Sequence, residues 1–445
     1  MGFFQVMSKS IDLWLIGVVI LLVILSCLMI FSTVYKSHAG FGVAFHSKQI
    51  AFGLAGFVIM IMLMSINYRL LEELAWPIYI ISIALLVIVL ILGRTVHGAM
   101  SWFSIAGFTL QPSEFAKVAL VIVLSRYINR LSSKDGLSYF SGLIIPILLA
   151  LLPMGLIILQ PDMGSTFIFF PLLMGILFLG NIRISYLITF MSFSGLVMGI
   201  PLFMTYAGQK QIHHSPITIF FFNILGRFTN TLIFVIAIVG LIFLIYYILH
   251  ELRFGVSIMS FIVAAIIFAV GIFASFPACM VLRNYQRQRL IAFINPNIDP
   301  LGTGYHIIQS QVAIGSGGFF GKGFLHGTQG QLGFLPVQHT DFIFSVFTEE
   351  LGFMSAIILF LAFLILLYRG VRITTTASNY FGKLLAGGIV WLFAIQIIIN
   401  LGVTMGLMPV MGVALPFMSY GGSALVSSMA ACGILLSIYS HRYMN

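Results

Sequence analysis

Long apolar runs separated by short polar segments recur along the whole chain. Runs of roughly 18 to 25 apolar residues can cross a hydrocarbon core of about 30 Å as helices. The pattern predicts twelve spans, at about residues 12–32, 49–66, 74–92, 111–134, 141–159, 165–179, 186–206, 231–250, 256–281, 342–368, 384–407 and 421–439. We therefore expect an all-α polytopic membrane protein, with residues 1–445 forming a single integral membrane domain.

Composition agrees with this fold class. Hydrophobic residues make up 60% of the chain and charged residues 7%, whereas an average soluble domain has about 25% charged residues. The three cysteines, Cys27, Cys279 and Cys432, lie far apart in apolar surroundings and lack metal-ligand spacing. This pattern favours buried packing over a metal site or a disulfide framework.

The distribution of lysine and arginine predicts the orientation. With twelve spans, eleven basic residues fall on the side of the termini and nine on the other side, and four of these nine belong to one long central stretch. Long loops carry little topological information, so the remaining excess predicts cytoplasmic termini. The central stretch, residues 282–341, then forms an extracytoplasmic loop.

This loop is basic and rich in glycine, which suggests an anionic ligand that carries phosphate. Arg283 and Arg287 have helical four-residue spacing, Arg289 follows, and guanidinium groups suit phosphate oxygens. These arginines and Lys322 are candidates for binding pyrophosphate, with anchoring to anionic lipid headgroups as the alternative. The glycines of IGSGGFFGKG would let backbone approach a ligand closely. Because Gly323 follows Lys322, the order of a nucleotide-binding loop is absent and ATP is not indicated.

Asp341 stands directly before an apolar helix in the segment LPVQHTDFIF. The next acids, Glu349 and Glu350, would lie about 12 to 13 Å further along that helix, beyond the separation of about 5 to 9.5 Å in paired-carboxylate glycosidases. Asp341 is therefore a lone carboxylate that could act as a general base, a metal ligand or a helix cap. His339 lacks the neighbouring ligands that a zinc site requires.

A second polar group lies in QPSEFAK, where Pro112 and Glu114 fit the first turn of a helix. Lys117 is on the same face just inside an apolar run, so a Glu114–Lys117 ion pair is expected, either facing a functional cavity or only structural. Asp162 begins a further helix and is either a tight connection or part of a cavity wall. Trp102 fits the interfacial aromatic belt.

Four segments together resemble the SEDS family of membrane polymerases. They are WFSIAGFTLQPSEFAK, LQPDMGST, GYHIIQSQVAIGSGGFFGKGFLHGTQGQLGFLPVQHTDFIFSVFTEELG and LMPVMGVALPFMSYGGSALV, in the family's order along nearly the whole chain. The GYHIIQS and LHGTQ details are more similar to the RodA branch, which acts in elongation, than to the FtsW branch, which acts in division.

The resemblance implies a peptidoglycan glycosyltransferase of the bacterial cytoplasmic (inner) membrane that polymerises lipid II on the outer face, in elongation and rod-shape maintenance. It implies a class B penicillin-binding protein as partner and no nucleic acid. The HTDF acid, essential in the family, is Asp341, and Trp102, Glu114 and Lys117 match family positions. Asp341 would accept a proton, and His339 would line the same cavity. No cofactor is expected, and a divalent cation, Mg²⁺ or Mn²⁺, is left open.

The chain departs from the family pattern in two places. Val337 stands where the family usually has a glutamate. Family members usually have ten spans, so residues 186–255 are interpreted as an inserted extra helix pair. The alternative functions are an FtsW-like septal polymerase and a lipid II flippase or transporter, for which intramembrane charges are also typical.

Overall fold

The computed structural model describes residues 11–35, 41–96, 99–105, 108–132, 141–182, 184–207, 228–252, 258–281, 284–296, 299–300, 302, 304–335 and 337–443. Its elements are α2 (Leu13–Val34), α3 (Phe41–Ser65), α4 (Arg69–Glu73), α5 (Ala75–Leu92), β1 (Arg94–Val96), β2 (Ala99–Ile105), β3 (Phe108–Leu110), α6 (Pro112–Ser132), α7 (Ser141–Leu159), α8 (Met163–Leu179), α9 (Ile184–Ala207), α11 (Phe228–Glu251), α12 (Ile258–Val281), α13 (Asn284–Ile294), α14 (Tyr305–Ser316), α15 (Thr328–Gln331), α16 (Ile343–Thr376), α17 (Tyr380–Thr404) and α18 (Gly422–Ser440).

The predicted helical fold class is confirmed, and each of the twelve expected spans coincides with a helix. Among the described residues, nine helices are long and apolar enough to cross a membrane. Helix α8 and the core of α12 are apolar but shorter, and α6 carries Glu114 and Lys117 in its first two turns. The number of membrane crossings therefore stays a prediction.

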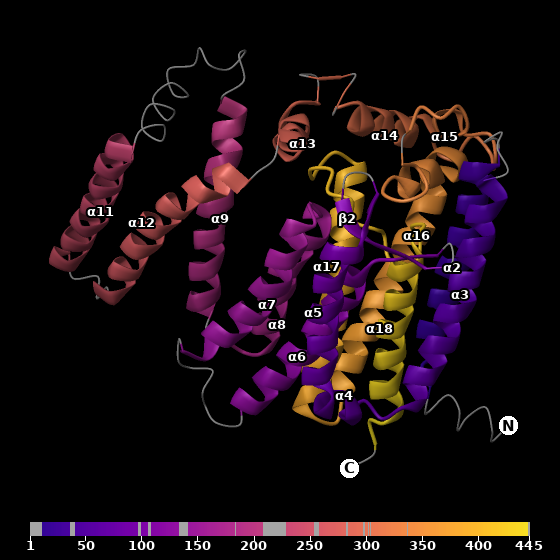
Figure 1. The fold of residues 1–445 in the computed structure, drawn as a ribbon, viewed down its shortest axis with the longest axis horizontal. Coiled ribbons are helices and arrows are strands. Elements are labelled where there is room, and N and C mark those ends of the chain that lie inside the picture. Colours follow the sequence, from indigo (N-terminus) through magenta and orange to yellow (C-terminus); the bar gives the residue numbers. More distant parts are fainter. Residues whose placement is uncertain are drawn as a thin grey trace. The chain divides into compact units, whose positions relative to one another are not determined.

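The chain divides into two compact units, residues 1–182 with 305–445 and residues 183–304. The first unit is a helical bundle centred on α17 and α18, in whose most apolar stretches 83% and 78% of the residues are buried. Helix α17 packs against α6, α8 and α16, and α18 packs against α3. In Figure 1 the start of α2 and the end of α18 lie at one end of this bundle, and α14 and α15 lie at the other.

Close packing of α3 on α18 depends on small side chains. A methyl group at Gly433 would lie 2.7 Å from the Met60 carbonyl oxygen, and one at Gly56 would meet the Met429 side chain. The two backbones can approach only because these positions are glycine, as is common where membrane helices associate without a hydrophobic driving force.

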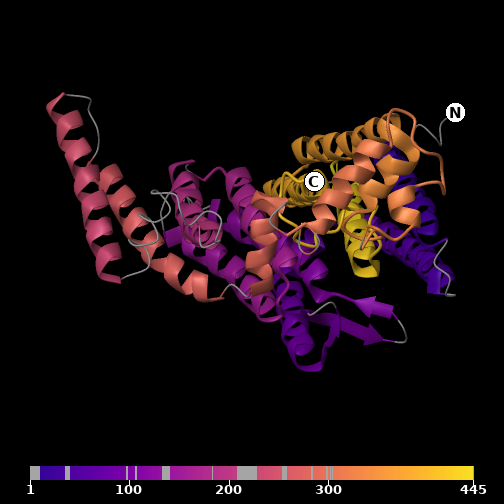
Figure 2. The ribbon, with the colours of Figure 1, turned by 90° about the horizontal axis from the view of Figure 1, so that it is seen from above.

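Residues 94–110, which the sequence led us to expect as a loop, instead form a three-stranded antiparallel sheet in the order β1-β2-β3. Strand β2 contacts α5 and α6, and β3 contacts the start of α18. The sheet lies at the margin of the first unit (Figure 2). The sequence contains a hairpin signal, Ala106-Gly107 between two runs of apolar and polar residues, that the span assignment overlooked.

The second unit consists of α9, α11, α12 and α13. Val235 of α11 and Ile272 of α12 form its buried core, against which Ile200 and Met204 of α9 pack. The expected insertion at residues 186–255 lies entirely within this unit, which also contains α12 and α13. Whether that segment is an insertion into a ten-helix core stays a prediction.

The central stretch is more ordered than the expected loop. Residues 282–341 contain α13, α14 and the one-turn helix α15. The division between the two units falls inside this stretch, because α13 belongs to the second unit and residues from Tyr305 onward belong to the first.

Candidate functional site

The HTDF segment forms a turn that leads directly into α16. Asp341 is half-buried, and Phe342 is the N-cap residue of the helix that starts at Ile343. Phe342 and Ile343 are 1% and 0% exposed. Burial of these two side chains holds the end of the turn against the protein core. Asp341 precedes the N-cap position, and therefore the helix-cap alternative does not describe its place in the structure.

Three successive backbone carbonyls of this turn accept hydrogen bonds, two from the segment that connects α17 with α18 and one from α17 itself. The Tyr420 backbone N–H donates to the His339 oxygen over 2.8 Å, and the Ser419 hydroxyl donates to the Thr340 oxygen over 2.6 Å. The Asn400 amide of α17 donates to the Asp341 oxygen over 3.0 Å and to the Val413 oxygen over 2.8 Å. These three hydrogen bonds thus fix the backbone of the turn.

Asn400 and Ser419 were not among the residues expected from the sequence. Asn400 is 1% exposed within an otherwise apolar helix, and a buried amide in a membrane helix is expensive unless it is hydrogen-bonded. That placement was an available signal for Asn400. Ser419 gives no comparable signal, because a single serine in a loop rich in glycine and proline is common and does not indicate a particular partner.

Two glycines shape the space beside the Asp341 carboxylate. A methyl group added to Gly412 would lie 3.6 Å from Asp341 Oδ2, and the φ of Gly412 is 79°, which favours glycine. Gly164 at the start of α8 packs directly on the backbone carbonyls of Met411 and Gly412. The HTDF turn, the α17–α18 connection and the LQPDMGST segment therefore meet at one place.

The QPSE segment joins the same group through Gln111. Its side-chain amide donates to Asp162 Oδ2 over 2.7 Å, and its backbone N–H donates to the Ser423 hydroxyl of α18 over 2.7 Å. Asp162 is the N-cap of α8 and accepts from the Ser165 backbone N–H over 3.1 Å, which confirms the predicted helix start. Burial raises the pKa of Asp162, whereas the hydrogen bonds from Ser165 lower it.

The predicted ion pair on α6 is confirmed. Helix α6 begins at Pro112 with Glu114 in its first turn, and Lys117 Nζ lies 2.7 Å from Glu114 Oε1. The two side chains are 8% and 2% exposed, so the pair is buried. Its charges act on Asp162, whose pKa the Glu114 carboxylate raises and the Lys117 ammonium lowers. That this pair lines a substrate cavity stays a prediction.

Trp102 and the three arginines lie in other places. Trp102 is on β2, paired with Arg94 on β1, and is half-buried. Arg283 lies outside the described residues. Arg287 and Arg289 are on α13, half-buried and exposed respectively, in the second unit. The grouping of these arginines with Asp341 stays a prediction.

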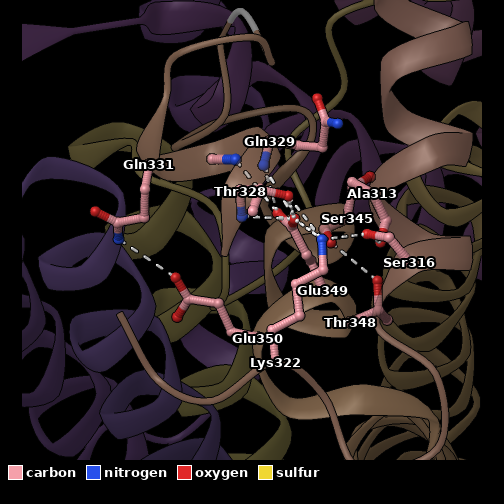
Figure 3. Close-up of polar contacts among 11 residues, drawn as sticks. Ala313, Ser316, Lys322, Thr328, Gln329, Gln331, Ser345, Thr348, Glu349 and Glu350 are labelled. Atoms are coloured by element: carbon pink, nitrogen blue, oxygen red, sulfur yellow. Dashed lines mark hydrogen bonds and ion pairs between the residues drawn. The ribbon is translucent and has the colours of Figure 1, made fainter. Parts of the chain in front are cut away.

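Lys322 has a different environment from the one expected for a ligand-binding side chain (Figure 3). Its ammonium donates to Glu349 Oε1 over 2.7 Å, to the Thr328 hydroxyl over 2.7 Å and to the Ser316 hydroxyl over 2.8 Å. An ammonium has three N–H groups, and all three are used. The geometry therefore favours a structural role for Lys322 over the predicted binding of pyrophosphate.

Glu349 is the centre of this cluster and is fully buried. Its carboxylate accepts the backbone N–H groups of Thr328, Gln329 and Gly330, at 2.7 to 3.3 Å, and so caps the one-turn helix α15. Glu350, equally buried, points to the other side, where it accepts from the Ser32 hydroxyl of α2 over 2.5 Å and from Gln331 over 3.4 Å. Neither acid is available beside Asp341.

The glycine-rich stretch approaches the backbone of α16. Helix α16 is kinked at Gly352, where φ is 79°. The Glu349 and Glu350 carbonyls freed by the kink accept from the backbone N–H groups of Lys322 and Gly323, over 3.0 and 2.9 Å. The nearby glycines leave no Cβ in the way, since one at Gly321 would meet the Glu350 carbonyl. The stretch thus satisfies backbone groups that lipid could not.

No group of three or more His, Cys, Asp or Glu side chains within the described part of the chain is arranged to hold a metal ion. His339 lies against aromatic rings instead, with ring centroids 5.4 Å from Phe45 and 5.7 Å from Tyr420.

Comparisons with known proteins identify the family of this chain. The family model FTSW_RODA_SPOVE, described as "Cell cycle protein", matches residues 12–222 and 227–444. Peptidoglycan glycosyltransferase RodA of Treponema pallidum (strain Nichols) is 34% identical over 400 residues, which cover 88% of each chain. Peptidoglycan glycosyltransferase MrdB of Escherichia coli (strain K12) is 34% identical over 424 residues, covering 95% of this chain and 93% of the relative.

Solved structures share the fold. A chain from work on "Structural coordination of polymerization and crosslinking by a peptidoglycan synthase complex" has a TM-score of 0.64 at 25% identity, covering 98% of this chain and 99% of that chain. The rod shape determining protein RodA of Thermus thermophilus has a TM-score of 0.58 at 23% identity, with the same coverage. The chain belongs to the FtsW/RodA/SpoVE family.

Proposed function

We propose that this protein is a peptidoglycan glycosyltransferase that polymerises lipid II into glycan strands for cell-wall elongation and maintenance of rod shape. The proposal rests mainly on the HTDF turn, whose three backbone carbonyls accept hydrogen bonds from Tyr420, Ser419 and Asn400. The Asp341 carboxylate of this turn is half-buried and lies beside Gly412. Relatives at 34% identity over most of the chain bear the name peptidoglycan glycosyltransferase.

In the proposed reaction Asp341 is the general base. The 4-hydroxyl oxygen of one lipid-linked disaccharide attacks the anomeric carbon of another, and the bond from that carbon to the phosphate oxygen breaks. The electron pair leaves with polyprenyl pyrophosphate, and the hydroxyl proton passes to Asp341. A carboxylate held on a rigid turn suits this role because a general base must lie within hydrogen-bonding reach of the proton it takes.

Other groups would assist binding. Arg283, Arg287 and Arg289 are proposed to hold the pyrophosphate, because guanidinium groups match phosphate oxygens and stabilise the charge that develops on the leaving group. The buried Glu114–Lys117 pair is proposed to shape the cavity wall together with Trp102 and His339. Lys322 is left out of the binding set, since its three N–H groups are already used.

Location and partner follow from independent arguments. The excess of basic residues on one side supports cytoplasmic termini, which would place Asp341 on the outer side of the bacterial inner membrane. A class B penicillin-binding protein is the proposed partner. The similarity to a chain of a peptidoglycan synthase complex that coordinates polymerization and crosslinking, with a TM-score of 0.64, supports this proposal.

The test is glycan polymerisation from lipid II by purified protein with its partner, comparing wild type with Asp341→Asn. Losing a general base costs about 10² to 10⁴ in rate, whereas folding should survive because asparagine is isosteric and the site is only half-buried. Glu251→Gln is a matched control, since Glu251 is an exposed acid at the end of α11 in the other unit.

A polymerisation rate near wild type in Asp341→Asn would refute the general-base assignment. Lipid II translocation assayed in liposomes distinguishes the flippase alternative. Translocation by the wild-type protein without any polymer would favour that alternative and refute the proposed reaction.

A further inference from the structure

A pocket lined by both charged and apolar side chains lies at the end of the first unit opposite the HTDF turn. Its volume is about 270 Å³, and its lining residues are Ile11, Asp12, Leu13, Trp14, Arg369, Arg372 and Tyr439. Helix α2 starts beside this pocket and ends where the Thr33 carbonyl accepts from Gln338, three residues before Asp341. A helix of 22 residues is about 33 Å long, so the pocket is separate from the candidate active site.

The pocket carries excess positive charge. Arg369 is neutralised by Asp12, with its Nη2 atom 2.5 Å from Oδ2 and its Nε atom 2.8 Å from the same oxygen. Asp12 also accepts the Leu15 backbone N–H over 3.1 Å, so its oxygens are occupied. Arg372, one turn further along α16, is exposed, and its side chain makes no hydrogen bond or ion pair with any described residue.

A further cation, Arg442, contacts one of the residues that line the pocket. The Arg442 guanidinium lies over the Tyr439 ring, 3.5 Å from its centroid, and Tyr439 itself lines the pocket. Because Asp12 neutralises Arg369, Arg372 leaves the pocket with a net positive charge. Guanidinium groups bind phosphate oxygens in a bidentate manner, which makes a phosphate-bearing anion the fitting ligand.

The pocket continues into an apolar surface. Trp14 and Leu13 at the start of α2 are 69% and 45% exposed, and Tyr368 on α16 is 65% exposed. Further along the same two helices, which pack together, Ile24 and Leu364 are also exposed. A free phosphate ion would make no use of these side chains, whereas the acyl chains of a lipid would cover them, and tryptophan is typical of a membrane interface.

We propose that this pocket binds the phosphate of an anionic phospholipid, with the headgroup at Arg372 and the acyl chains along the exposed side chains of α2 and α16. The Asp12–Arg369 pair shapes the pocket by tying the start of α2 to α16. Arg372 supplies the charge that selects an anionic headgroup over a zwitterionic one.

The experiment is native mass spectrometry of the full-length purified protein in detergent, titrated with phosphatidylglycerol or with phosphatidylethanolamine of the same acyl chains. Wild type should retain phosphatidylglycerol preferentially. Arg372→Gln should weaken that binding about fivefold, the effect of one cation at an anionic surface. Lys383→Gln is the matched control, an exposed cation in the first turn of α17, directly after α16, and should bind as wild type does.

Equal weakening of phosphatidylglycerol binding by Arg372→Gln and Lys383→Gln would overturn the proposal. General electrostatic attraction between the protein and anionic lipid would then explain the binding without a specific site. Equal retention of the two lipids by wild type would overturn it as well. A third arm adds inorganic phosphate in competition, and full displacement of the lipid at millimolar concentration would show a site for free phosphate and refute the lipid assignment. Because the Arg372 side chain is exposed, its replacement should leave the melting temperature unchanged.

Discussion

The Lys322–Glu349 ion pair offers a test of whether Lys322 has a structural role or binds a ligand. The two side chains should contribute unequally to the stability of the fold. Glu349→Gln removes the negative charge that pairs with Lys322. It also replaces one carboxylate oxygen by an NH₂ group, so at least one of the backbone N–H groups of Thr328, Gln329 and Gly330 loses its acceptor. Removing one member of a buried ion pair costs about 3–5 kcal/mol, and we expect a loss near the upper end of that range.

Lys322→Met should cost much less. The Glu349 carboxylate would keep its three backbone donors and the Thr328 hydroxyl. Of the three hydrogen bonds that the Lys322 ammonium donates, the one to this carboxylate accounts for most of the loss, about 1.5–3 kcal/mol. The Lys322 side chain is 25% exposed in the wild type, which moves the loss toward the lower end.

The assay is unfolding of the purified proteins in detergent by heat and by denaturant, with Lys383→Met as an exposed control. The expected order of stability is wild type and Lys383→Met, then Lys322→Met, then Glu349→Gln. A larger loss for Lys322→Met than for Glu349→Gln would refute the reasoning. Lipid II binding by Lys322→Met should equal wild type, and its loss in a folded variant would restore Lys322 to the pyrophosphate-binding set.

Three further predictions test other contacts. Asn400→Leu should lower kcat of polymerisation by up to about 10² with little change in KM, because it frees the Asp341 carbonyl and lets the turn shift by about 1 Å; a change in KM alone would argue against a positioning role. Lys117→Met leaves the Glu114 carboxylate buried and unpaired and should destabilise by about 3–5 kcal/mol, whereas the double variant with Glu114→Gln should recover much of that loss, as a double-mutant cycle of unfolding midpoints would measure. Cysteines introduced at Ser138 and Gln209, both outside the described residues, should label from opposite sides of the membrane in a cysteine-free background, and labelling from one side would rule out twelve spans.

Local sequence was sufficient for the helices and for contacts between near neighbours. The Pro112 start of α6 and the Glu114–Lys117 pair involve residues no more than five positions apart. The position of Asp341 before α16 follows from the change from polar to apolar residues at Phe342. Each of these features depends on helical periodicity or capping, which a single segment specifies by itself.

The features that the sequence did not predict also have a physical cause. The contact between the glycines near Lys322 and α16 was missed because the kink at Gly352 was not foreseen, and an isolated glycine in an apolar run does not by itself predict a kink. The sheet at residues 94–110 was overlooked because its strands are short and its flanking helices dominate the hydropathy.

The sequence by itself thus determined a polytopic helical protein, the limits of its apolar segments and the lone carboxylate at the start of α16. Only the tertiary structure decided which groups surround that carboxylate and which charges are already paired. Asn400 meets Asp341 across 59 positions of sequence, and Ser32 meets Glu350 across 318. Such contacts arise because buried polar groups must find partners wherever the folded chain brings them close, and no local pattern in the sequence encodes that choice.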